Sequence, residues 1–371
     1  MPRSLTLPDE LDTLLRLQAR LYADDPGWVA PLRPWLARRL DRRGAFFREA
    51  ELVGLAVERD GEVAGVCTVL RDRRHEEVKG EAAAFFGFFE CVEDEGVARE
   101  LLDGASEIAR GWGARVLRGP RNLTRVEEVG FLVEGFGTRP PMLTGHHPPY
   151  YARFAEALGF AQHHDVLAYD VALYADGRPR PLPQALAEKA AAVDVPGLAV
   201  RPVRPLGLGG DLDRCHAVFV EAFRDVPDNT PMPRAQFVSL ARIAIALAGR
   251  EMMQIATVGD RVAGFALTFP ELNEVIGAAK GSLSPAGIAR MLGAWPRRAT
   301  ASFKLIGVLP EHRGSGLHAL LIREAIEGIR RAGYTRLEAS LIDERNSRMR
   351  RVVEDAGMAV YRRYRIFERT I

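Results

Sequence analysis

The sequence has few cysteines, almost no net charge and no long apolar run. Its three cysteines, Cys67, Cys91 and Cys215, lie far apart, which excludes a disulfide framework and a CxxC metal site. Its 51 Lys and Arg against 49 Asp and Glu leave a net charge of +2, which argues against a general nucleic-acid binder. The apolar stretches around 82–89 and 243–248 are much shorter than the roughly 18 residues of a membrane span. No apolar signal core follows Met1, so we expect a reduced, cytoplasmic protein.

What the sequence does contain is an internal repeat. Val63-Ala64-Gly65 and Val262-Ala263-Gly264 each open an apolar run just after a turn signal, and each turn follows another strand-like run. Both regions therefore predict β-hairpins. Glu156–Phe160 and Glu354–Met358 are alike and follow the two hairpins in the same order. Because the landmarks recur in order, we interpret the chain as a tandem duplication.

The predicted elements indicate a mixed α/β fold in two domains. Residues 176–197 are rich in proline and predict a linker with one short helix, between domains at 1–175 and 198–371. In the second domain the hairpin precedes a series of alternating strands and helices. These are a strand at 303–308, a helix at 317–331, a strand at 336–342, a helix at 347–356 and a last strand at 359–369.

The sharpest motif lies where the strand at 303–308 runs through a glycine-containing turn into the helix at 317–331. Several backbone N–H groups point forward together at such a helix start, and the helix dipole adds positive potential there. Gly314 and Gly316 allow a ligand to approach the main chain closely. The turn therefore predicts a pyrophosphate cradle, and Arg313 and His318 could add charge-assisted bonds.

This turn resembles the acyl-CoA motif of the GNAT acyltransferase superfamily, Arg/Gln-x-x-Gly-x-Gly/Ala. The chain has Arg313-x-x-Gly316-x-His318, with histidine where a small residue is usual. Asn346 begins the helix that in the family lies beside the pantetheine arm. The resemblance covers most of 198–371. It implies that acyl-CoA, such as acetyl-CoA, is bound without a metal by Val308, Arg313, Gly314, Ser315, Gly316, Leu317, His318 and Asn346.

The first half resembles a second, diverged GNAT copy, and its layout is similar to that of bacterial tandem GNAT-like proteins. The resemblance implies two tandem GNAT-like domains, each with a mixed central sheet flanked by helices. The loop at 90–96, which corresponds to the pyrophosphate turn, carries four carboxylates and one glycine. We therefore expect the first copy to keep the fold and to have lost the CoA site. Its long insertion at 120–148 is a candidate for shaping the acceptor channel.

The resemblance implies direct attack of an amine on the thioester, which calls for a base and an acid. The position at which the family often has a tyrosine acid is Val353 here, and Tyr361 is the tentative substitute. Glu271 and Glu274 are the candidate bases, with Glu338 as the alternative. For each carboxylate, a solvated surface position is the competing interpretation.

The leading hypothesis is therefore an N-acetyltransferase that acts on a small-molecule or peptide amine, without membrane or nucleic acid, with a homodimer as the candidate assembly. A second hypothesis is a non-catalytic acyl-CoA-binding or scaffold protein, because the acid position holds Val353 and the first copy has lost its loop. A third is transfer of aminoacyl groups from tRNA, which the small net charge disfavours.

Overall fold

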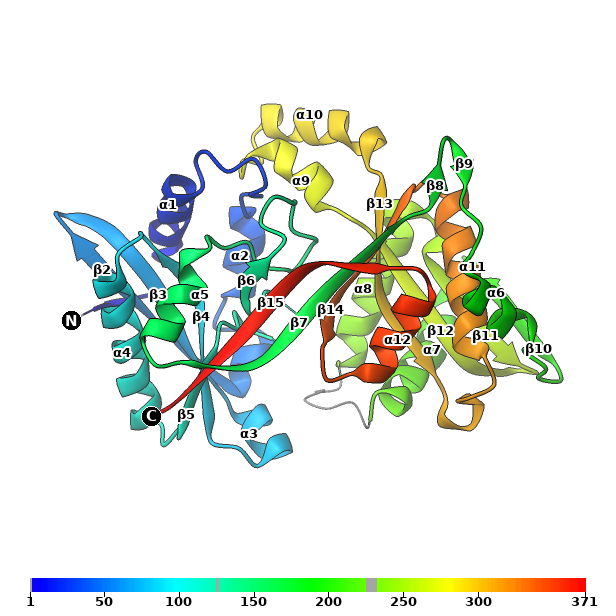
Figure 1. Cartoon of the computed structure of the whole chain (residues 1–371), viewed down its shortest axis with the longest axis horizontal. Helices are drawn as coiled ribbons and strands as arrows, with labels where there is room; N and C mark the ends of the chain where they lie inside the picture. Colours follow the sequence, from blue (N-terminus) through cyan, green and yellow to red (C-terminus); the bar gives the residue numbers. More distant parts are fainter. Residues whose placement is uncertain (1, 125–126, 225–231) are drawn as a thin grey trace.

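In a computed structural model, which describes residues 2–124, 127–224 and 232–371, both halves of the chain share one mixed β-sheet flanked by helices (Figure 1). Residues 125–126 of the insertion lie outside the described residues. The elements of the first half are β1 (Arg3–Leu5), α1 (Leu11–Leu21), α2 (Arg33–Arg39), η1 (Ala45–Arg48), β2 (Ala50–Arg59), β3 (Glu62–Asp72), α3 (Arg73–Lys79), β4 (Ala83–Cys91), α4 (Glu95–Gly111), β5 (Val116–Gly119), β6 (Phe131–Glu134), α5 (Tyr150–Ala157) and β7 (Ala161–Ala172).

A linker and the second half follow in nearly the same order. The linker holds β8 (Tyr174–Ala175), β9 (Arg178–Pro179) and α6 (Gln184–Ala191). The second half consists of β10 (Leu198–Pro202), α7 (Leu208–Ala222), α8 (Arg234–Ala248), η2 (Arg250–Met252), β11 (Met253–Val258), β12 (Arg261–Pro270), α9 (Asn273–Ala279), α10 (Pro285–Ala294), η3 (Trp295–Arg297), β13 (Thr300–Val308), η4 (Pro310–His312), α11 (Leu317–Arg331), β14 (Arg336–Asp343), α12 (Ser347–Asp355) and β15 (Ala359–Thr370).

The repeat predicted from the sequence is visible in the strand pairing. The antiparallel hairpins β2–β3 and β11–β12 are confirmed. In each half the next strand runs antiparallel to the hairpin and then pairs in parallel with a further strand, β4 with β5 and β13 with β14. The parallel pairing ends at Phe85 with Arg118 in the first half and at Phe303 with Ala339 in the second. Beyond these residues the paired strands diverge, so each half contains an opening in the sheet.

The last strand of each half lies in the sheet of the other half. Strand β7 ends the first half but pairs with β14, whereas β15 ends the second half and pairs with β5 and β6. The two long strands also pair with each other, as their crossing paths in Figure 1 show. The expected pair of separate central sheets is therefore a single sheet of thirteen strands among the described residues, in the order β1-β2-β3-β4-β5-β15-β7-β14-β13-β12-β11-β10, with β6 beside β15.

Apolar side chains fill separate cores on the two halves. The largest core surrounds β11–β14 and includes the apolar face of α11, which buries Leu317, Leu321 and Ile329. Helix α11 begins and ends where the amphipathic pattern predicts, at 317 and 331. The short linker helix is confirmed as α6, which packs against α11. Helices α9 and α10, in the segment between the hairpin and β13, are elements that the sequence patterns do not predict.

Candidate active site

A cavity of about 450 Å³ opens where β13 and β14 diverge. We call it the slot. Its walls come from both strands, from α8 and from the first turn of α12. Met142 and Leu143, from the insertion of the first half, also line it. Most of the lining is apolar, and Lys304, Asp343 and Asn346 are among its polar members. The slot is therefore largely apolar, and residues from both halves of the chain line it.

The backbone of β13 presents N–H groups to the slot. The Leu309 N–H donates to the Ala263 carbonyl at 2.9 Å, on the side of the hairpin. Because successive N–H groups along a strand point in opposite directions, those of Val308 and Ile306 face the side on which β14 has diverged. A ligand in the slot could therefore add itself to the edge of β13, as the expected role of Val308 requires.

The predicted pyrophosphate turn leads from this edge into α11. Gly314 and Gly316 have φ of 85° and 84°, a region that glycine adopts without strain. Gly316 is the N-cap residue of α11 and provides no side-chain cap. Among the described residues, the N–H groups of Gly314, Gly316 and His318 have no hydrogen-bond partner. These donors sit at the positive end of the helix dipole, which is the arrangement that binds phosphate.

The side chains of the turn differ in what they can offer. The exposed guanidinium of Arg313 donates to the Ala222 carbonyl at 3.1 Å, while the Ser315 hydroxyl donates to the His312 carbonyl at 2.8 Å. Leu317 is buried in the core. Burial and the nearby Lys189 lower the pKa of His318, so this imidazole is neutral at pH 7 and cannot supply the charge-assisted bond that the sequence suggests.

The linker helix α6 covers one side of the turn. A Cβ on Gly316 would lie 2.7 Å from the Lys189 carbonyl oxygen and 3.1 Å from Cγ2 of Val193. Gly316 is therefore needed for packing as well as for backbone freedom. No heavy atom other than those of its chain neighbours lies within 4 Å of a Cβ placed on Gly314. Gly314 consequently faces the open side, where a cofactor would approach.

Asn346 lies at the other wall of the slot and starts α12. Its side-chain oxygen accepts a hydrogen bond from the Met349 N–H at 3.0 Å, which caps the helix, and both residues line the slot. Val353 is buried in the core, so it contributes packing and no proton at the expected acid position.

The first half closes the equivalent site with its own side chains. The carboxylate of Asp94 caps α4 by accepting hydrogen bonds from the N–H groups of Gly96 at 2.7 Å and Val97 at 3.3 Å. Tyr151 also blocks this site, because its hydroxyl accepts a hydrogen bond from the Cys91 N–H at 2.8 Å. The groups that would hold a cofactor are thus already bonded within the chain.

Glu90 was wrongly assigned by the sequence analysis to the loop at 90–96 of the first half. Glu90 belongs to β4, which continues to Cys91, and it is only 5% exposed. Its carboxylate accepts hydrogen bonds from Gln18, Tyr22 and Tyr151. Burial raises the pKa of Glu90 to about 7 despite these donors.

Two of the three candidate bases have structural contacts that explain them. The Glu274 carboxylate accepts bonds from the N–H of Ala299 at 2.7 Å and from the hydroxyl of Thr300 at 2.7 Å, which fixes the start of β13. The Glu271 carboxylate accepts bonds from the N–H groups of Met142 at 2.9 Å and Asn273 at 2.9 Å. Glu271 therefore clamps the insertion of the first half onto the second half, next to the slot.

The buried carboxylates are not the solvated surface groups of the competing interpretation. Glu271 is 5% exposed and Glu338 is 2% exposed. Burial raises the pKa of Glu271 to about 7, although Lys304 opposes the shift. Glu338 accepts a hydrogen bond from Ser302. Burial and the charge of Glu338 raise the pKa of Tyr361 far above its usual value, so this phenol keeps its proton.

The side chain that the sequence analysis missed is Lys304. It occupies a bulge of β13, where the register with β12 shifts, and it lines the slot. Its Nζ lies 3.8 Å from the Glu338 carboxylate, 3.3 Å from the Ser340 hydroxyl and 3.4 Å from the Met142 carbonyl. The only sign of Lys304 in the sequence was its charge within a mostly apolar predicted strand. Together, Lys304, Glu271, Glu338 and Tyr361 form a polar cluster where β12, β13, β14 and β15 meet.

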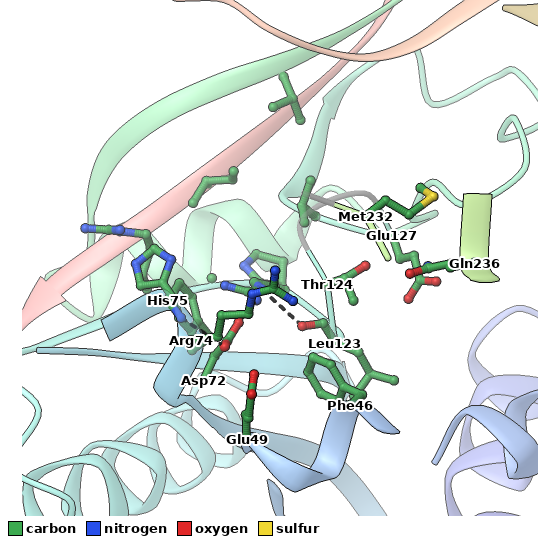
Figure 2. A pocket seen from close by; sticks show the side chains of 18 of the residues that line it. Phe46, Glu49, Asp72, Arg74, His75, Leu123, Thr124, Glu127, Met232 and Gln236 are labelled. Atoms are coloured by element: carbon green, nitrogen blue, oxygen red, sulfur yellow. Dashed lines mark hydrogen bonds and ion pairs between the residues drawn. The ribbon is translucent and has the colours of Figure 1, made fainter. Parts of the chain in front are cut away.

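A second cavity, of about 510 Å³, continues from the slot toward the first half (Figure 2). The residues that line both cavities are Glu127, Val166, Phe223, Met232, Gln236 and Leu305. In Figure 2, Met232, Gln236 and Glu127 lie at one end of the view and His75, Arg74 and Asp72 at the other. The middle of the combined space therefore has four apolar residues together with Glu127 and Gln236, and its far end in the first half is charged.

Comparisons with known proteins agree with this geometry. Residues 221–358 match the Acetyltransferase (GNAT) family. This part of the second half is therefore similar to the GNAT acetyltransferases. A tandem GNAT protein from the clavulanic acid biosynthesis pathway superposes with a TM-score of 0.57 at 18% identity, over 100% of this chain and 97% of that one. The mixed α/β fold and the tandem GNAT architecture are thus confirmed.

Two relatives match nearly the whole chain. A protein of Caulobacter vibrioides named bacterial ceramide synthase is 28% identical over 98% of this chain and 96% of its own length. Protein YghO of Escherichia coli is 26% identical over 100% of this chain and 95% of its own length. Both matches therefore extend over the two halves of this chain.

Proposed function

We propose that the chain is an N-acyltransferase that takes an acyl group from acyl-CoA, bound by the second half, and transfers it to an amine. The observation that carries this proposal is that β13 lines the slot as far as Ile306 and then leads, through Val308, into the turn at 313–318. The turn presents unbonded N–H groups for the pyrophosphate, and the edge presents those of Val308 and Ile306 for the pantetheine arm. The match of residues 221–358 to the GNAT family supports acyl-CoA as the donor.

The size and lining of the cavities favour an acyl group longer than acetyl. With the pantetheine arm in the slot, an acetyl group would leave the second cavity, of about 510 Å³, empty of ligand. Phe223, Met232 and Leu305 give the passage between the two spaces an apolar side, which suits a hydrocarbon chain, and Glu127 and Gln236 line the same passage. We therefore replace the initial expectation of an acetyltransferase with a transferase of longer acyl chains. The ceramide synthase relative, whose name denotes an N-acylated lipid product, supports this choice.

The chemistry requires a new C–N bond and the loss of a C–S bond. The neutral amine of the acceptor attacks the thioester carbonyl, the carbonyl oxygen gains negative charge, and the intermediate expels the CoA thiolate. The amine proton leaves for solvent or a nearby base, and the thiolate, with a pKa of about 8–9, is a good leaving group without a dedicated acid. Lys304 in the bulge of β13 is placed to stabilise the developing negative charge.

A direct assay tests this proposal. The purified chain is incubated with acyl-CoA donors of increasing chain length and a panel of amines, including long-chain amino alcohols. Thiol release and the mass of the amide product are measured. We expect turnover with long-chain donors and little with acetyl-CoA. Binding of acyl-CoA with no amide from any amine would instead support the non-catalytic acyl-CoA-binding alternative, and turnover with acetyl-CoA alone would contradict the chain-length proposal.

A further inference from the structure

Helix α10 carries an apolar stripe that the described structure leaves uncovered. Ile288, Met291, Leu292 and Trp295 follow the i, i+3, i+4, i+7 spacing that normally faces a core. Leu292 is nevertheless 68% exposed, Ile288 is 45% exposed and the preceding Leu283 is 42% exposed. We call Leu283, Ile288, Met291, Leu292 and Trp295 the α10 patch. Large apolar side chains gathered on one outer surface are a mark of an interaction site.

Helix α10, which carries most of the patch, lies at the periphery of the molecule. In Figure 1, α9 and α10 form the upper edge of the view, and α10 packs mainly against α9 and the adjoining turn η3. Gly287 is the one buried residue of α10. The equivalent place in the first half, just after its hairpin, holds only the short charged helix α3. The α10 patch is thus an addition to one copy of the repeat, and the fold of that repeat does not require it.

The charge around the patch has a single sign. Residues 275–298 contain four basic side chains, Lys280, Arg290, Arg297 and Arg298, and no aspartate or glutamate. Lys280, Arg290 and Arg297 are exposed, and none of them forms an ion pair among the described residues. Arg298 lies 4.3 Å from the centre of the Trp295 ring and donates to the Tyr334 hydroxyl. An apolar stripe edged only by cations matches a surface that is apolar below and anionic above.

We propose that the α10 patch docks the protein on the surface of an anionic lipid bilayer. Leu283, Ile288 and Leu292 would enter the boundary between headgroups and acyl chains, and Arg290 and Arg297 would contact lipid phosphates. No helix among the described residues is long and apolar enough to cross a membrane, so the contact would be peripheral. The expectation from the sequence that no membrane takes part is replaced by this proposal, which does not depend on the proposed function.

Vesicle co-sedimentation of the full chain tests the proposal. We expect binding to vesicles of phosphatidylcholine mixed with phosphatidylglycerol, weaker binding to phosphatidylcholine alone, and a loss of binding with added salt. The double variant Ile288→Asp/Leu292→Asp should bind the mixed vesicles at least about tenfold more weakly. Arg290→Gln/Arg297→Gln should lower affinity by about tenfold for the mixed vesicles, with little effect on neutral ones.

A matched control comes from the first half. Val78 on α3 is 51% exposed, so Val78→Asp places the same charge on an exposed apolar position outside the patch and should leave binding unchanged. Thermal melts confirm that the α10 variants fold. Absence of wild-type binding to the mixed vesicles, or equal binding by the Ile288→Asp/Leu292→Asp variant, would overturn the proposal. So would a wild-type dimer in analytical ultracentrifugation that the same variant dissociates, because a second copy would then cover the patch.

Discussion

The hydroxyl of Tyr151 accepts a hydrogen bond from the Cys91 N–H at 2.8 Å, so a side chain occupies the strand edge in the first half. Cys91 pairs with Gly65 as Val308 pairs with Gly264, which makes Val308 the equivalent of Cys91 in the second half. Because Glu156–Phe160 corresponds to Glu354–Met358 in the repeat, the equivalent of Tyr151 is Met349. Met349 lines the slot and leaves the edge of β13 open. The strand edge is therefore blocked by Tyr151 in the first half and free of such a hydrogen bond from Met349 in the second half.

A tyrosine at position 349, the equivalent of Tyr151, should block the acyl-CoA site of the second half. In Met349→Tyr, the phenol would reach toward the Val308 N–H as Tyr151 reaches Cys91, and acyl-CoA affinity should fall by about tenfold or more because that donor and part of the slot are lost. Isothermal titration calorimetry measures the change. Met349→Leu conserves the volume and should bind nearly as the wild type does. Equal affinity in the tyrosine and leucine variants would show that the slot does not hold the pantetheine arm.

A carboxylate at Gly314 should act as Asp94 does in the first half. Gly314 has room for a side chain, so Gly314→Asp would place a negative charge beside the unbonded N–H groups of the turn. We expect a loss of about 1–3 kcal/mol in CoA binding. Gly314→Asn has the same shape and the same positive φ to adopt, and should lose much less. If the two variants bind CoA equally, the site does not carry the phosphates.

Glu271 should behave as a clamp between the halves and not as the general base. Glu271→Gln keeps an oxygen that can accept from Met142 and Asn273, so kcat should change by less than about tenfold. Glu271→Ala leaves those buried N–H groups unsatisfied and should destabilise the protein by about 1–3 kcal/mol. Steady-state kinetics and urea unfolding measure both effects. A fully folded Glu271→Gln variant that has lost catalysis would assign the base role to Glu271 instead.

The pKa of Glu90 gives stability a specific pH dependence. Burial raises this pKa from 4.5 to about 7, so the folded protein retains a proton that the unfolded chain has already released between these values. Stability therefore falls as the pH rises through about 7, by roughly 3 kcal/mol from this group alone. Glu90→Gln should flatten the fall of the unfolding free energy between about pH 5 and pH 8. An unchanged slope would contradict a buried, proton-retaining Glu90.

The sequence predicted those elements whose pattern is local. Helix α11 has one continuous apolar face, and the glycine turn after β13 has a local signature, so the ends of this helix were predictable. The exchange of β7 and β15 was not. Both strands alternate loosely and either could pair with β5 or β14, so only the packing of the whole sheet decides.

The site itself was predictable in part. The glycine turn at 313–318 could be recognised because its spacing is short, whereas Met142 and Leu143 reach the slot from about 160 residues away in the sequence. Lys304 was missed because a single lysine in a strand gives no sign of a bulge that turns it into a cavity. Glu90 was assigned to a loop because its neighbours are acidic, although three hydrogen bonds hold it in a core.

The stoichiometry of acyl-CoA binding tests the central claim most directly. Calorimetric titration of a long-chain acyl-CoA into the wild-type chain should give one site per chain. Gly314→Asp should weaken that site by about 1–3 kcal/mol, and Gly96→Asp, a glycine-to-aspartate change in the corresponding loop of the closed copy, should leave it intact. Two sites per chain, or a single site that survives Gly314→Asp and is lost in a folded Gly96→Asp variant, would contradict the assignment of the cofactor to the second half.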